Sequence, residues 1–215
     1  MRPLGLLGAA LSGAPPFAEL GTGTPNATKF LRGDGVWATL PVTSAYEFVQ
    51  AVPIAGIQFD VINLAPGYDY EFHFDDLISS GVDNLVASFG TNNTTFPTSS
   101  IYYNQYIGGH SDPGVSVPWW GWGSNSGFFA AYIAGLNNDP AVSAWTHFFV
   151  NDVGASKYKH YGAKGFFVSG SNGYAYGMNM EGYWRNASAI TAIRFFSFQS
   201  YALTGTCLVY RRRRS

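Results

Sequence analysis

A row of ionisable side chains with alternating spacing lies in the first half of the chain. Asp69, Glu71, His73 and Asp75 occupy every second position of one segment, and Asp76 follows directly. Alternate residues of a β-strand lie on one face, so these side chains are expected to form one polar surface. Oxygen ligands there could converge on a cation such as calcium, but no Asp-x-Asp-x-Asp-Gly loop accompanies the row. We therefore expect a solvated face, or one that meets Arg or Lys of a neighbour, and assign no metal and no cofactor.

Three tryptophans fall within four positions, at Trp119, Trp120 and Trp122, and are flanked by proline and glycine. Three indoles so close in sequence cannot all enter one small core. Indole rings stack well on sugar faces, so an exposed set predicts a glycan-binding platform. Nearby polar residues, among them Asn104 and Asp112, are expected to hydrogen-bond to sugar hydroxyls. The alternative is a plug at a subunit interface, where aromatic residues are also enriched, and both interpretations stay open.

Four consecutive arginines, Arg211, Arg212, Arg213 and Arg214, lie at the end of the sequence. A cluster of this kind is ordered only when it docks on a surface. We expect it to contact acidic groups of an adjacent protomer or of another protein in the same assembly. Nucleic acid is not expected as a partner, because four arginines without a basic face make a small footprint.

The remaining charges are segregated along the chain. The net charge is −1, yet positions 35–156 carry ten acidic residues and no Lys or Arg, whereas positions 157–215 carry nine basic residues and one acid. This pattern can bring opposite charges together within the fold or between subunits, which would help orientation more than affinity.

Catalytic motifs are missing from the sequence. The four histidines are scattered, and no Gly-x-Ser-x-Gly, HExxH or CxxC motif is present. The single cysteine, Cys207, lies in an expected strand and is interpreted as a core residue. Glycoside hydrolysis needs only two carboxylates, so the inventory alone does not exclude it. We nevertheless expect a protein that is not an enzyme.

The composition indicates which elements must position these residues. In 215 residues only 12% are charged, 17% are aromatic, and 26 glycines stand beside 11 prolines. Such a chain is too aromatic for a disordered protein and too rich in Gly and Pro for a helical bundle. It has no apolar run of about 18 residues, so no membrane insertion is expected. A β-rich protein remains.

Alternating and apolar segments predict about ten short strands separated by turns. Ile57–Leu64 and Tyr68–Asp75 flank a Pro-Gly turn and are predicted to be neighbouring strands, and a hairpin is predicted around Ser171-Asn172-Gly173. One helical turn is expected near Asp139–Ala144. The other predicted strands are Tyr46–Val52, Leu85–Phe89, Ile101–Ile107, Phe128–Ile133, Trp145–Val150, Ile190–Phe198 and Thr206–Tyr210.

These elements predict an all-β fold, an antiparallel β-sandwich of the jelly-roll kind. Three parts are expected: an extended N-terminal arm at 1–44, the sandwich head at 45–210 and a basic tail at 211–215. The arm contains several prolines, which favour extended chain, and it has no core of its own. It is therefore expected to be ordered only against a partner.

The segment Gly21–Ala38, GTGTPNATKFLRGDGVWA, resembles a short segment that recurs in tail-fibre and other virion proteins of tailed bacteriophages. The likeness covers less than a tenth of the chain. Ile190–Phe196 and Thr204–Tyr210 are similar, more weakly, to the closing strand pair of β-sandwich modules in phage structural proteins. The resemblance implies a virion component, commonly trimeric, with an N-terminal attachment arm and a distal globular head.

Within the arm, Phe30, Leu31, Val36 and Trp37 form a small apolar cluster that three copies meeting on an axis could bury. We therefore expect a homotrimeric fibre or spike subunit in the virion, assembled in the bacterial cytoplasm. The arm would attach to other virion proteins, of the capsid or the tail, and the head would bind host cell-surface polysaccharide. The alternative is a capsid decoration or cement protein without receptor binding.

Overall fold

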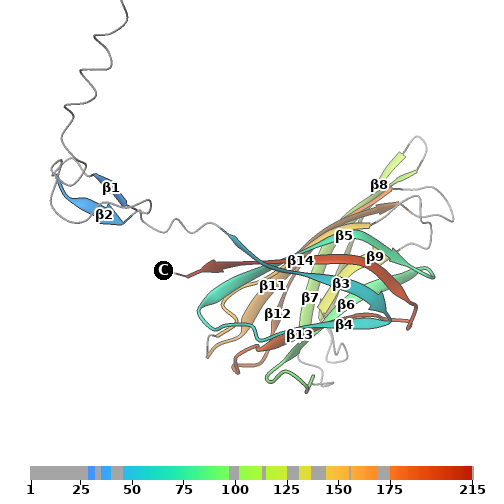
Figure 1. Cartoon of the computed structure of the whole chain (residues 1–215). Helices are drawn as coiled ribbons and strands as arrows, with labels where there is room; N and C mark the ends of the chain where they lie inside the picture. The colour runs from blue at the N-terminus through green and yellow to red at the C-terminus, as the bar shows by residue number, and fades with distance from the viewer. Residues whose placement is uncertain are drawn as a thin grey trace, which may run out of the picture. The chain divides into compact units, whose positions relative to one another are not determined.

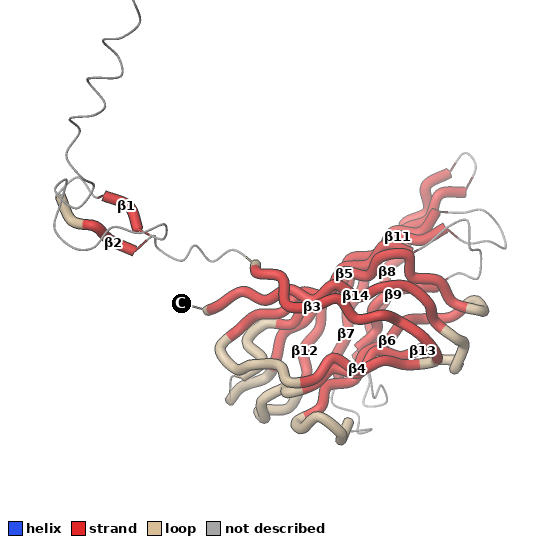
Figure 2. The backbone as a smooth tube through the Cα atoms, in the orientation of Figure 1, coloured by secondary structure: helices blue, strands red, loops and turns tan. Residues whose placement is uncertain are grey.

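The computed structural model describes residues 29–31, 35–39, 46–96, 102–112, 115–124, 131–136, 144–154, 156–168 and 175–214. The chain divides into two units, Met1–Ala45 and Tyr46–Ser215. The described residues of both units form strands, turns and loops without a helix (Figures 1 and 2), which confirms the all-β prediction. No described segment is a long apolar helix of the kind that crosses a membrane.

The N-terminal unit contains a short hairpin. Strand β1 (Lys29–Leu31) pairs antiparallel with β2 (Trp37–Thr39), so that Leu31 lies opposite Trp37. The intervening Gly35 has a φ of 78°, in the left-handed region that glycine enters without strain. The predicted arm is thus not extended throughout.

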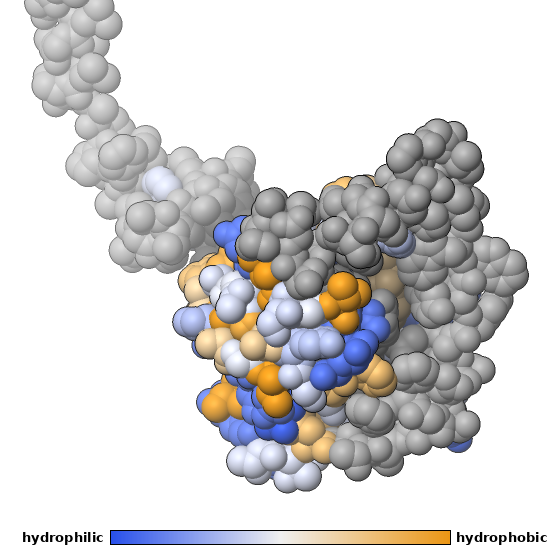
Figure 3. Space-filling view, turned by 90° about the vertical axis from the view of Figure 1, so that its right-hand side faces the viewer, coloured by the Kyte–Doolittle hydropathy of each residue, from blue (hydrophilic) through white to orange (hydrophobic). Residues whose placement is uncertain are grey.

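The head consists of two antiparallel sheets. The larger sheet has eight strands in the order β3 (Glu47–Gly56), β14 (Leu203–Arg213), β5 (Tyr68–Ser79), β10 (Ala144–Val150), β11 (Lys159–Val168), β12 (Ala175–Trp184), β7 (Tyr102–Asp112) and β8 (Val115–Ser124). The smaller sheet has the order β4 (Gln58–Ile62), β13 (Ala192–Ser197), β6 (Asp83–Gly90) and β9 (Ala131–Leu136). On the face shown in Figure 3, described hydrophobic residues are interspersed with hydrophilic ones.

The core lies between the two sheets and is built largely from aromatic side chains. Phe72 and Phe74 of β5 and Phe148 of β10 are fully buried beneath the larger sheet. Phe195, on β13 of the smaller sheet, meets all three, with ring-centroid separations of 5.2, 5.1 and 5.8 Å. The two sheets therefore form one sandwich, as predicted, and the alternate residues of β5 and β10 must lie on the outer face.

Two details differ from the sequence-based expectation. Strands β4 and β5 were predicted to pair, but the chain crosses between the sheets at Pro66-Gly67, and β4 pairs with β13 instead. Strand β8 was not predicted, because Pro118 and the surrounding glycines disfavour strand. It pairs only with β7, at the edge of the larger sheet, where one side needs no partner. The expected helical turn falls on residues that lie outside the described ones, apart from Ala144.

Candidate functional site

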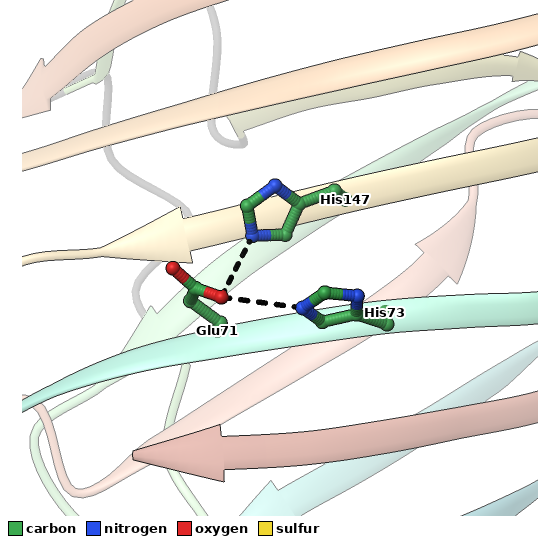
Figure 4. Close-up of side chains that lie close together, drawn as sticks. All are labelled: Glu71, His73 and His147. Carbon is green, nitrogen blue, oxygen red and sulfur yellow. Dashed lines mark hydrogen bonds and ion pairs between the residues drawn. The ribbon is translucent and has the colours of Figure 1, made fainter. Parts of the chain in front are cut away.

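Three ligand-type side chains meet on the outer face of the larger sheet (Figure 4). Glu71 and His73 lie two residues apart on β5, and His147 lies directly opposite His73 on the neighbouring strand β10. All three alternate with the core phenylalanines of the same strands, so strand geometry places them on the surface opposite the core. We call Glu71, His73 and His147 the His–Glu cluster.

Both imidazoles of the His–Glu cluster point to one carboxylate oxygen. The Oε2 atom of Glu71 lies 3.2 Å from Nε2 of His73 and 3.3 Å from Nε2 of His147. The two imidazole rings lie side by side, with centroids 4.5 Å apart. One donor atom from each residue lies within 4.8 Å of the others, which is close enough for all three to bind a single ion.

The contact of His147 differs from that of His73. The Nε2 atom of His147 is shielded from solvent and has no partner in hydrogen-bond geometry among the described residues, despite its short distance to Glu71. Burial lowers the pKa of His147, and the Glu71 carboxylate opposes this shift without cancelling it. His147 therefore favours the neutral imidazole, whose free ring nitrogen has a lone pair for a Lewis acid.

Aromatic side chains surround the His–Glu cluster. Tyr46 lies beside Glu71, and burial together with this acidic neighbour raises the pKa of Tyr46 to about 12. The ring of Tyr210 on β14 lies edge-on to His73 at 5.1 Å, and Phe149 lies 6.2 Å from His147. These contacts restrict the rotamers of the cluster and limit the access of water, while leaving His73 about one-third exposed.

A second feature of the outer face is a row of tyrosines. Tyr103 of β7 stacks on Tyr183 of β12, with ring centroids 4.6 Å apart and planes within 7°. Tyr158 lies beyond Tyr183 at 6.2 Å and is also nearly parallel to it. Arg185 donates a hydrogen bond to the hydroxyl of Tyr103 at 3.2 Å and also lies near Tyr158. Tyr158 and Tyr183 remain largely exposed, so this tyrosine row presents aromatic surface to solvent.

The predicted glycan residues lie next to the tyrosine row in the sheet. Trp119, Trp120 and Trp122 belong to β8, and the backbone of Trp122 pairs with Gln105 of β7, two positions from Tyr103. The side chains of the three tryptophans, and those of Asn104 and Asp112, lie outside the part of the chain that the structure describes. The glycan-platform prediction thus stays a prediction. Sequence reasoning missed the tyrosine row, because its members come from three separate segments.

The assembly-arm residues are described only in part. Val36 is exposed and Trp37 is half-buried, whereas for Phe30 and Leu31 the structure describes the backbone alone. The indole nitrogen of Trp37 is shielded from solvent and has no hydrogen-bond partner among the described residues. The proposed burial of this group between copies of the chain stays a prediction.

The C-terminal arginines require a correction. They were expected to contact acidic groups of an adjacent protomer or of another virion protein, but three of the four form ion pairs within the chain. Arg212 and Arg214 lie 2.9 and 3.2 Å from the buried carboxylate of Asp69, and Arg211 pairs with Glu47. The cause is strand pairing, which places Arg211 opposite Glu47 on β3 and Arg212 opposite Asp69 on β5. The segment up to Arg213 is thus the end of β14 rather than a separate tail.

The acidic row of β5 is therefore divided between two environments. Asp69 pairs with arginines, which is one of the two expectations stated for this row. It also accepts a hydrogen bond from the backbone N–H of Asp152 at 2.8 Å. Glu71 and His73 instead join His147, a residue that sequence reasoning did not connect with them. Asp75 and Asp76 are exposed.

In comparisons with known proteins, no family model, no curated protein and no solved structure matches this chain.

Proposed function

We propose that this protein is a non-enzymatic structural component of a tailed-bacteriophage virion, a trimeric fibre or spike subunit whose head binds host cell-surface glycan. The proposal rests on the resemblance of Gly21–Ala38 to virion proteins. It is supported by the division of the chain into an N-terminal unit and a β-sandwich head.

The observation that carries glycan binding is the tyrosine row beside the tryptophan-rich edge of the sheet. Aromatic rings bind sugars by stacking on their apolar faces, and polar groups at the rim fix the orientation of the hydroxyls. Tyr158 and Tyr183 offer exposed rings, and Gln105 and Glu181, paired on neighbouring strands, supply exposed polar groups. Figure 1 shows β8 projecting at one end of the head, where a large polymer can approach it.

The test is binding of the full chain to an array of bacterial surface polysaccharides. Tyr183→Ala and Trp120→Ala each remove an aromatic ring from the proposed platform, and we expect each to weaken binding about 2- to 12-fold, since a lost stacking contact costs roughly 0.5–1.5 kcal/mol. Trp145→Ala is the matched control, because Trp145 is exposed on the same sheet but lies on β10, away from the platform. It is expected to bind like the wild type.

Two outcomes would contradict glycan binding. If Trp145→Ala weakens binding as much as Tyr183→Ala, the tyrosine row is not the site. If the chain binds no polysaccharide but assembles on purified capsids, the protein is a decoration or cement protein.

A further inference from the structure

We propose that the His–Glu cluster is a zinc-binding site. This inference is independent of the proposed glycan binding, because it concerns different strands and a different ligand. It begins from the donor set. Two imidazoles and one carboxylate are ligands that zinc accepts, whereas calcium needs six or more oxygens and would find one carboxylate here.

The distances suit a tetrahedral ion. Ligand atoms bound to zinc at about 2.0–2.1 Å in tetrahedral geometry lie about 3.4 Å from one another. Two of the three separations in the cluster, 3.2 and 3.3 Å, are already close to this value. The two imidazole nitrogens lie no more than 4.8 Å apart. Small rotations of the side chains are therefore enough to bring all three donors around one ion.

The positions of the ligands are fixed before any ion binds. Glu71 and His73 lie on β5, which is paired on both sides, with β14 and with β10. His147 is held opposite His73 by the register of the β5–β10 pair. The backbone therefore loses no conformational freedom on binding, and the remaining cost is that of ordering three side chains.

Surrounding residues support the cluster as outer partners of a metal site do. The hydroxyl of Tyr46 lies beside Glu71, where it can donate a hydrogen bond that orients the carboxylate. Two cations lie near the cluster. Lys164 on β11 is opposite His147 and is exposed to solvent, whereas Arg212 lies over the ring of Tyr46 and pairs with Asp69, so the charge of Arg212 is largely balanced. The solvent-shielded Nε2 of His147, which lacks a partner in hydrogen-bond geometry, is the donor that gains most from an ion.

Three protein ligands leave one tetrahedral position open. His73 reaches solvent, with its side chain 34% exposed. The fourth ligand is thus water or a donor atom of a molecule bound at this surface.

The test measures zinc binding to the full chain, prepared without a histidine tag, by isothermal titration calorimetry. We expect one ion per chain. We expect His147→Asn and Glu71→Gln each to weaken binding by more than tenfold, because each removes a ligand. His160→Asn is the matched control. His160 is also a surface histidine beside a glutamate, with Nε2 3.9 Å from Glu181, but no third ligand completes this pair among the residues that the structure describes. It is expected to bind zinc like the wild type.

Two further measurements keep the result unambiguous. The circular dichroism spectrum of each variant without metal must match that of the wild type. If His147→Asn does not fold, the nearly isosteric Glu71→Gln variant provides the test of ligand removal. Cobalt(II) bound to the wild type should give the intense visible absorption of a tetrahedral site. Absence of zinc binding by the wild type, or equal affinity of the wild type and Glu71→Gln, would overturn the proposal.

Discussion

Cys207 shows how burial controls the chemistry of a single side chain. It lies on β14, opposite Phe74, and is fully buried in the core. Burial disfavours the thiolate, and this raises the pKa of Cys207 well above its ordinary value. Its interpretation as a core residue agrees with this environment.

Cys207 is therefore expected to resist thiol reagents while the protein is folded. The thiolate is the reactive form, and a raised pKa keeps the thiol protonated at neutral and mildly alkaline pH. Treatment with iodoacetamide at pH 8 should leave the native protein unmodified and alkylate the protein in guanidinium chloride, as mass spectrometry would show. Rapid alkylation of the native protein would mean that β14 opens at Cys207.

The raised pKa of Cys207 also makes the free energy of unfolding depend on pH. The unfolded thiol loses its proton at about pH 8.5, before the folded one does. The contribution of this group to the free energy of unfolding is present below that pH and is lost as the pH rises above it.

At the scale of the element, β12 contains two glycines with opposite surroundings. A Cβ at Gly182 would collide with the carbonyl oxygen of Tyr103 and lie 2.7 Å from the ring of Tyr161, whereas a Cβ at Gly177 would meet no atom of the described residues within 4 Å. The close approach at Gly182 is what allows β7 and β11 to pack on either side of β12.

Gly182→Ala is expected to lower the free energy of unfolding by at least about 2 kcal/mol, because neither the strand backbone nor the buried ring can move aside freely. Gly177→Ala, in the same strand, should change it by less than about 0.5 kcal/mol. Urea denaturation of the two variants compares them directly. Equal midpoints for both variants would show that the sheet adjusts easily at Gly182.

The strands show what sequence can predict and what it cannot. The alternation from Tyr68 to Asp75 predicts β5 and places Glu71 and His73 on one face, because the period of a strand is local information. The partnership with His147 depends on the register between β5 and β10, which no periodicity encodes. The same limit explains why the tyrosine row was missed and why β4 was assigned to the wrong neighbour.

For the whole molecule, the segregated charges have a clear structural role. Each of four acidic residues before position 157 pairs with basic residues from position 157 onward: Glu47 with Arg211, Asp60 with Arg194, Asp69 with Arg212 and Arg214, and Asp152 with Lys157 and Arg214. The sequence left open whether the opposite charges would meet within the fold or between subunits. In the described part of the head, these opposite charges meet within the chain. The Asp60–Arg194 pair is bidentate, at 2.8 Å for both bonds, and joins β4 to β13.

Assembly should then depend on the N-terminal unit rather than on the charges of the head. A two-stranded hairpin of three residues per strand is too small to be stable alone, and Trp37 in it has a solvent-shielded indole nitrogen without a hydrogen-bond partner among the described residues. Three copies that meet there would bury the apolar residues of each.

We therefore expect the full chain to sediment as a trimer, and a chain that begins at Tyr46 to sediment as a monomer with the same unfolding midpoint for the head. Trp37→Ala in the full chain should shift the equilibrium toward the monomer, and Trp145→Ala should leave it unchanged. Analytical ultracentrifugation measures the oligomeric state of these four proteins, and urea denaturation measures the unfolding midpoint of the head. If the chain that begins at Tyr46 is itself trimeric, the sandwich mediates association. The exposed aromatic surface of the larger sheet is then the subunit interface, which is the alternative role expected for the three tryptophans.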